Sequence, residues 1–107
     1  MKSVLFLCSR NRRRSPTAER IFGGRADLEV ALAGLAPDAD EPVSPEHLAT
    51  AELVFVMEKI HRSRLIRRFR PYLRDTRIIC LDIPDEYEFM DPRLIALLEV
   101  RAGPHLR

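Results

Sequence analysis

The chain has 107 residues, of which 46% are hydrophobic and 32% are charged, and its formal net charge is +2. A chain of this length can bury one hydrophobic core, so we expect residues 1–107 to form a single domain. Its apolar runs are far shorter than the roughly 20 residues that cross a bilayer, which excludes a membrane-spanning helix. No signal-peptide h-region follows Met1, and we therefore expect a cytoplasmic protein whose two cysteines are reduced thiols.

The hydrophobic pattern divides the chain into alternating strands and helices. Short apolar runs predict four strands, at residues 4–7, 28–32, 53–57 and 77–81. Start signals and helical periodicity predict a helix after each strand, at residues 15–22, 45–51, 59–69 and from 92 onward. Such alternation favours right-handed crossovers and a parallel sheet with helices on both faces. The sequence therefore predicts a doubly wound α/β domain, which binds ligands at the carboxyl ends of its strands.

Local signals set the ends and the faces of these helices. Gly23 and Gly24 are typical of the end of a helix, and Asp91 before Pro92 is typical of an N-cap. Within residues 59–69, four apolar side chains are spaced for one buried helix face: Ile60, Leu65, Ile66 and Phe69. We expect this face to pack against the sheet.

The first strand leads directly into an arginine-rich loop and then into the first helix. A loop in this position turns backbone N–H groups and the positive end of the helix dipole toward its ligand, which favours a tetrahedral oxyanion. Cys8 is predicted to be the nucleophile on phosphorus, since neighbouring cations and a helix N-terminus favour the thiolate. Arg14 can donate paired hydrogen bonds to two phosphate oxygens. Ser15 can donate its hydroxyl to the sulfur of Cys8.

Residues 8–19, CSRNRRRSPTAE, resemble the phosphate-binding loop of the low-molecular-weight protein tyrosine phosphatases, which reads Cys, five residues, Arg, Ser, Pro. Ala33-Gly34, LVFVME at 53–58 and IPDEY at 83–87 also resemble segments of that family. The resemblance implies the strand order 2-1-3-4. It also implies that phosphate is held by seven consecutive loop residues: Ser9, Arg10, Asn11, Arg12, Arg13, Arg14 and Ser15.

Three positions depart from the pattern of this family. Arg10 stands where the family has a glycine, Leu32 replaces a serine that helps to hold the phosphate loop, and Glu86 replaces a proline. With 107 residues, the chain resembles a short variant of the family. The added arginine makes the predicted loop more positive than the family pattern requires.

The resemblance also implies a general acid from the loop after the fourth strand. Asp82 and Asp85 both follow that strand, and either can reach the end of the sheet where Cys8 is expected. We favour Asp85, because the Ile-Pro pair before it and Tyr87 after it match the family's loop. Asp91 also precedes a proline, but we interpret it as a helix N-cap.

These features predict a phosphomonoesterase, a cysteine-dependent protein tyrosine phosphatase that acts through a cysteinyl-phosphate intermediate. Its partner would be a phosphorylated protein or a small phosphate ester, with phosphate or sulfate able to occupy the loop. The resemblance implies no cofactor and no metal. Two alternatives remain: an arsenate reductase-like enzyme, for which Cys80 is the only other thiol, and a non-catalytic phosphate-binding or interaction module.

The remaining polar residues receive simpler interpretations. Arginines cluster again between residues 62 and 77, which we interpret first as a solvated helix face; the alternative is a footprint for an acidic or nucleic-acid partner. We therefore predict neither a nucleic-acid nor a membrane partner. Cys80 is expected to be a small hydrophobic residue. Surface or helix-capping positions are expected for the three histidines: His47, His61 and His105.

Overall fold

The computed structural model describes residues 2–10, 14–73 and 75–106. Its centre is a four-stranded sheet in the order β2-β1-β3-β4, and every neighbouring pair of strands is parallel. The strands are β1 (Lys2–Cys8), β2 (Leu28–Gly34), β3 (Leu53–Val56) and β4 (Arg77–Cys80). The predicted four-stranded parallel sheet and its order are confirmed. The third strand ends at Val56, one residue earlier than expected.

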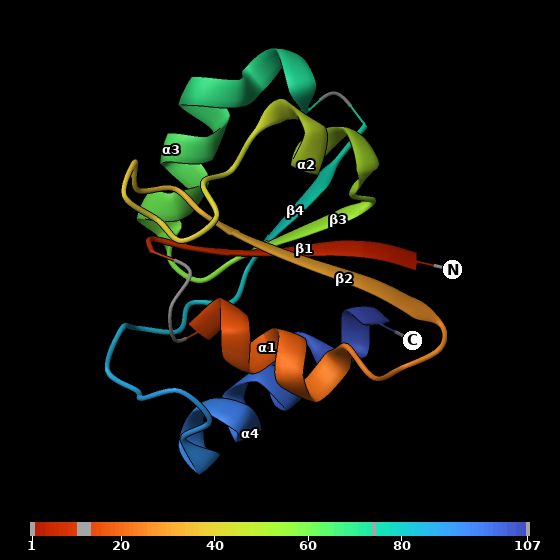
Figure 1. The fold of residues 1–107 in the computed structure, drawn as a ribbon, viewed down its shortest axis with the longest axis vertical. Coiled ribbons are helices and arrows are strands. Elements are labelled where there is room, and N and C mark those ends of the chain that lie inside the picture. The colour runs from red at the N-terminus through yellow and green to blue at the C-terminus, as the bar shows by residue number, and fades with distance from the viewer. Residues whose placement is uncertain (1, 11–13, 74, 107) are drawn as a thin grey trace.

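The four helices are α1 (Arg14–Phe22), α2 (Pro45–Thr50), α3 (Lys59–Phe69) and α4 (Pro92–Arg101). Two short 3₁₀ turns follow α3 and α4, at Arg70–Tyr72 and Gly103–Leu106. Helices α1 and α4 cover one face of the sheet, and α2 and α3 cover the other (Figure 1). The predicted doubly wound arrangement is thus confirmed. No described helix has both the length and the apolar character needed to cross a bilayer.

Strand β1 is buried on both faces, as its apolar run predicts. Val4, Phe6 and Cys8 belong to the apolar cluster beneath α1 and α4, whereas Leu5 and Leu7 belong to the cluster beneath α2 and α3. The ring of Phe6 stacks on two other aromatic rings, with centroids 5.8 Å from Phe22 and 5.0 Å from Phe55. The first strand is therefore the centre of both cores, and Cys8 at its end has a rigid support.

One prediction about α3 is wrong. Ile60 is 52% exposed, and the buried face of the helix is formed by His61, Leu65 and Phe69. These three side chains follow one another at intervals of four residues, so they lie along one stripe that faces the sheet. Ile60 lies on the side of α3 that faces away from this stripe, toward solvent. The buried histidine has polar partners at the carboxyl end of the sheet.

The ends of the other helices follow the predicted signals. Asp91 caps α4, since its Oδ1 accepts a hydrogen bond of 2.9 Å from the N–H of Arg93. Helix α1 ends at Phe22, and the N–H of Gly23 still donates to the carbonyl of Glu19 at 2.7 Å. Helix α1 starts at Arg14, one residue before the predicted start at Ser15. The side chain of residue 14 therefore projects from the first turn of the helix.

A close approach at Gly34 fixes the loop that follows β1. Gly34 is the register partner of Cys8 at the ends of the two strands. A Cβ at Gly34 would lie 2.6 Å from the carbonyl oxygen of Ser9 and 2.6 Å from the Cβ of Ala39. The same Ser9 carbonyl accepts a hydrogen bond of 2.8 Å from the N–H of Ala36. Only glycine leaves room for this contact between the loops after β1 and β2.

Replacing Gly34 with alanine is expected to lower the free energy of unfolding by roughly 1–3 kcal/mol, because the new Cβ must displace backbone atoms. Gly24→Ala is the matched control, since a Cβ there meets no atom within 4 Å. Its effect should be neutral or stabilising by about 0.5 kcal/mol. Urea unfolding followed by circular dichroism measures both effects, and equal stabilities of the two variants would contradict the close approach.

Candidate functional site

The candidate site lies at the carboxyl edge of the sheet, where the ends of β1, β3 and β4 meet the start of α1 (Figure 1). Cys8 is the last residue of β1, and Arg14 is the first residue of α1. Both side chains are buried. Of the residues predicted to bind phosphate, Asn11, Arg12 and Arg13 lie outside the described part of the chain.

Arg14 is the residue to which the other elements of the site connect. Its side chain is 3% exposed, and Nη1 donates to Oε2 of Glu58 at 2.7 Å and to the carbonyl of Ile83 at 2.8 Å. Its Nε lies 3.8 Å from Oδ1 of Asp85, which is an ion pair but not a hydrogen bond. Nη1 therefore anchors the side chain, and the fork of Nε and Nη2 is the part suited to a tetrahedral anion.

The two aspartates of the loop after β4 are placed differently. Asp85 is 57% exposed and contacts Arg14, so its carboxyl group is open to solvent at the edge of the site. Asp82 has a φ of 56°, and its carbonyl accepts a hydrogen bond of 2.6 Å from Nη1 of Arg101. The backbone at Asp82 is therefore held by α4. Of the two, only Asp85 forms an ion pair with Arg14 among the described residues.

A hydrogen bond to α1 holds the other end of this loop. The N–H of Met90 donates to Oγ1 of Thr17 at 3.0 Å. Met90 has a φ of 63°, a left-handed conformation that costs energy for a residue with a long side chain. The contact with Thr17 helps to maintain that conformation. The loop that carries Asp85 is thus attached at both ends to elements of the site.

Glu58 and His61 are functional candidates that the sequence analysis missed. Glu58 is the N-cap of α3, where its backbone carbonyl accepts a hydrogen bond of 3.0 Å from the N–H of His61, and its side chain binds Arg14. In return, Nδ1 of His61 accepts a hydrogen bond of 3.2 Å from the N–H of Glu58. Because Nδ1 is an acceptor, neutral His61 carries its proton on Nε2. That atom lies 3.2 Å from Oγ of Ser9, so it donates to the serine.

A weak sequence signal for this pair did exist. An acid at the N-cap and a polar residue three positions later form a capping box, a local pattern that can be read from MEKIH. His47 has the same local role, since its Nδ1 accepts a hydrogen bond of 3.0 Å from the N–H of Ser44. The expected capping role is therefore confirmed for both histidines. Only the tertiary structure brings the His61 cap next to Ser9.

The environment keeps His61 uncharged. Burial lowers the pKa of His61 from 6.5 to about 4, and the positive charge of Arg14 is the second cause. The carboxylate of Glu58 raises this pKa, but it does not compensate for burial. Neutral His61 has its hydrogen on Nε2 and donates it in a hydrogen bond to Oγ of Ser9. The serine hydroxyl can then donate its own proton toward the loop.

The remaining predicted residues take distinct places. Oγ of Ser15 is buried, and no described residue is its hydrogen-bond partner. A buried hydroxyl with no partner costs free energy, and a ligand or thiolate at this position would satisfy it. The exposed side chain of Arg10 lies 3.9 Å from Asp38. Its guanidinium is therefore paired with the loop after β2.

The two cysteines lie far from each other in the fold. Cys8 belongs to the apolar cluster on the α1 and α4 side of the sheet, whereas Cys80 packs against the cluster on the opposite side. Strand β3 also separates β1 from β4. The expectation that Cys80 is a small hydrophobic residue is confirmed. Because their side chains leave opposite faces of the sheet, the two thiols cannot form a disulfide without rearrangement.

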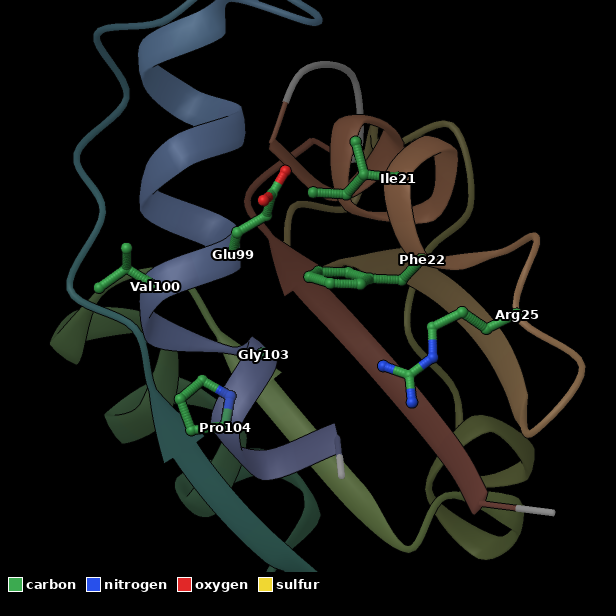
Figure 2. A pocket seen from close by; sticks show the side chains of 7 residues that line it. All are labelled: Ile21, Phe22, Arg25, Glu99, Val100, Gly103 and Pro104. Atoms are coloured by element: carbon green, nitrogen blue, oxygen red, sulfur yellow. The ribbon is translucent and has the colours of Figure 1, made fainter.

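A cavity of about 510 Å³ lies elsewhere, between α1, α4 and the turn that follows α4 (Figure 2). Its lining residues come from these segments: Ile21, Phe22, Arg25, Glu99, Val100, Gly103 and Pro104. Neither Cys8 nor Arg14 is among them. The described residues also contain no cluster of three or more His, Cys, Asp or Glu that could hold a metal ion.

Comparison with known proteins identifies solved structures of similar fold. A structure of Vibrio vulnificus Wzb in complex with benzylphosphonate is 20% identical, with a TM-score of 0.77, and the match covers 98% of this chain and 97% of the other. The tyrosine phosphatase Wzb from Escherichia coli K30, in complex with phosphate, is 20% identical, with a TM-score of 0.73, and the match covers 98% of this chain and 96% of the other.

A third similar structure is a Cys-to-Ser mutant of a YwlE arginine phosphatase with a phosphorylated active-site serine. It is 20% identical, with a TM-score of 0.70, and the match covers 98% of this chain and 99% of the other. No protein-family model and no curated protein sequence matches the chain. At this identity the likeness establishes the fold, and the chain has the fold of these proteins.

The free energy of unfolding is expected to fall as the pH drops from 6.5 to 4, because the unfolded chain protonates His61 before the folded protein does. The loss attributable to this residue is at most about 3 kcal/mol. His61→Gln should remove that part of the pH dependence, since glutamine does not titrate. Urea unfolding of both proteins at several pH values measures the difference, and identical slopes would contradict a neutral buried histidine.

Proposed function

We propose that this chain is a cysteine-dependent phosphomonoesterase of the low-molecular-weight protein tyrosine phosphatase family. One observation carries the proposal: Cys8 ends the central strand, while Arg14 begins the next helix and is anchored beside Asp85. This arrangement combines a nucleophile, an anion-binding fork and a candidate proton donor at one edge of the sheet. A nucleophilic thiol must stay reduced, so we also infer that the protein acts in a reducing compartment such as the cytoplasm.

The proposed reaction has two steps. The thiolate of Cys8 attacks phosphorus in line and forms an S–P bond, while the bond to the ester oxygen breaks. Nε and Nη2 of Arg14 hold two equatorial phosphate oxygens, and Asp85 gives a proton to the departing oxygen. Water then attacks the phosphocysteine and transfers a proton to Asp85. Inorganic phosphate leaves, and Cys8 returns to the thiolate form.

The contacts of Glu58 and His61 give these groups a fixed geometry. Glu58 and the carbonyl of Ile83 bind Nη1 of Arg14, so the guanidinium is oriented before the ester arrives. His61 donates to Ser9, the residue after the nucleophile. Donors that are already oriented need no reorganisation as charge develops in the transition state. Glu58 and His61 are therefore positioning residues and not reacting groups.

The proteins of similar fold support this chemistry. In the YwlE mutant, the serine that replaces the cysteine is phosphorylated, and the two Wzb structures hold phosphate and benzylphosphonate. A benzyl group bound through a phosphonate resembles the side chain of phosphotyrosine. We therefore propose phosphotyrosine in a protein as the preferred substrate. Phosphoarginine is the substrate to compare with it, because YwlE is an arginine phosphatase.

The structure also bears on the two alternatives. Arsenate reduction by a cysteine nucleophile needs a second, resolving thiol close to that cysteine. Cys80 packs on the opposite face of the sheet from Cys8. This placement favours phosphate ester hydrolysis over arsenate reduction. A non-catalytic phosphate-binding module would use the same anion site without turnover. Activity measurements on the intact protein distinguish it from the enzyme.

Cys8→Ser is expected to abolish hydrolysis of an aryl phosphate ester, while binding of inorganic phosphate should persist because Arg14 and the loop amides remain. Cys80→Ser is the matched control and should retain the wild-type rate, since its side chain lies on the other face of the sheet. Steady-state kinetics and phosphate-induced thermal stabilisation measure the two properties. Phosphate binding without turnover by the wild type would favour the non-catalytic module.

Asp85→Asn is expected to slow phosphotyrosine hydrolysis by roughly 10²–10⁴-fold, because a poor leaving group needs a proton in the transition state. The loss should be smaller for a nitrophenyl ester, whose oxygen departs with little help. Asp82→Asn is the matched control and should change neither rate by more than a small factor, since its backbone is held by Arg101. A leaving-group-dependent loss in Asp82→Asn alone would overturn the assignment of the acid.

A further inference from the structure

The solvent-facing side of α3 and its continuation carries a concentration of positive charge. Residues 59–70 contain no acidic residue, and five of them are exposed arginines, which we call the α3 basic face: Arg62, Arg64, Arg67, Arg68 and Arg70. Like charges this close on one helix repel one another and destabilise it. Such a concentration calls for a physical reason beyond helix formation.

Two surface arginines outside α3 are neutralised in ion pairs, whereas Arg20, Arg77 and the α3 basic face take part in none among the described residues. Arg25 pairs with Asp27 at 2.6 Å, and Arg93 pairs with Asp91 at 3.0 Å. No residue of the α3 basic face takes part in an ion pair among the described residues. Arg68 donates to the carbonyl of Leu35 at 2.8 Å, which leaves its charge in place. The α3 basic face therefore keeps its positive charge exposed to solvent.

The α3 basic face begins at the candidate site. Glu58, which caps α3, binds Arg14 directly. Arg64 is close enough for its charge to act on His61. A helix of this length extends for roughly 16 Å, the span of about five residues of an extended peptide. A chain whose modified residue occupies the site can therefore lie along α3 with its neighbouring residues.

We propose that the α3 basic face docks an acidic segment of the phosphoprotein substrate, close in sequence to its phosphorylated residue. This inference rests on the proposed function, which it deepens by naming the class of substrate. The exposed side chain of Ile60 in the first turn of α3 adds an apolar contact for the same segment. Charge complementarity accelerates the encounter of enzyme and substrate and discriminates against neutral and basic sequences.

Two features favour a peptide over a nucleic acid. The loop after β2, which contacts α3 through Leu35, carries exposed acidic side chains at Asp38 and Glu41. These carboxylates lie close to Arg10 and His47, so the positive charge of the α3 basic face does not continue onto this loop and suits a narrow chain. Single-stranded nucleic acids also need aromatic side chains on which to stack. Of the large exposed aromatic residues in the described part of the chain, Phe89 lies in the loop before α4 and Tyr72 ends the turn that carries Arg70, so only Tyr72 adjoins the α3 basic face.

The test compares two phosphotyrosine peptides. The acidic peptide has several glutamates near the phosphotyrosine, and the second peptide has glutamine at each of these positions. The variant R64Q/R67Q removes two charges of the α3 basic face, and R20Q/R77Q removes two exposed arginines elsewhere as the matched control. The kcat/KM of each protein is normalised to its own rate on a small aryl phosphate. Binding of labelled, unphosphorylated forms of both peptides, and of a single-stranded oligonucleotide of equal charge, is measured by fluorescence anisotropy.

Wild type and control should prefer the acidic peptide, and R64Q/R67Q should lose roughly 3- to 20-fold of that preference at low ionic strength. Added salt should reduce the preference as well. Equal losses in both variants, or no preference in the wild type, would overturn the proposal. Tighter binding of the oligonucleotide than of the acidic peptide would also overturn it and indicate a nucleic-acid partner. If no ester is hydrolysed, the proposed function fails, and peptide binding still tests the docking surface.

Discussion

The ion pair between Arg14 and Glu58 is the contact on which the candidate site depends. It joins the first residue of α1 to the N-cap of α3 at 2.7 Å, and the same guanidinium nitrogen also reaches the carbonyl of Ile83 after β4. A guanidinium as deeply buried as Arg14 has to be neutralised and hydrogen-bonded, because an unpaired buried charge is costly. The start of α1 and the segments after β3 and β4 are thereby held together around one charge.

The surrounding sheet supplies the rigidity that this contact needs. β1 is buried on both faces and pairs with β2 and β3, so the position of Cys8 is determined by two neighbouring strands. Gly34 allows the next loop to follow β2 closely at the same edge. Reacting groups on rigid elements keep their geometry, whereas the same groups on long free loops would lose it. The site thus depends on packing that begins several residues away from it.

Charge is distributed unevenly over this small protein, although its net charge is only +2. Inside the site, one arginine is compensated by Glu58 and Asp85, and His61 stays neutral. Outside it, the α3 basic face remains without acidic partners among the described residues. The paired guanidinium of Arg14 has a fixed geometry before an anion binds, and an outer surface with unpaired positive charge attracts negatively charged partners. In the proposed reaction, the first arrangement serves the chemical step and the second serves the encounter with the substrate.

The sequence by itself determined the sheet, its connections and the end of the strand where Cys8 lies, because strand and helix patterns are local properties of the chain. The spacing of Cys8, Arg14 and Ser15 and the loop around Asp85 could be recognised for the same reason. Only the tertiary structure decided three other features. His61 is buried in place of Ile60, Glu58 binds Arg14, and Asp85 rather than Asp82 is the aspartate that pairs with Arg14. Each depends on contacts between segments far apart in sequence, and the free energy of burying and pairing charges across them is not encoded in any local pattern.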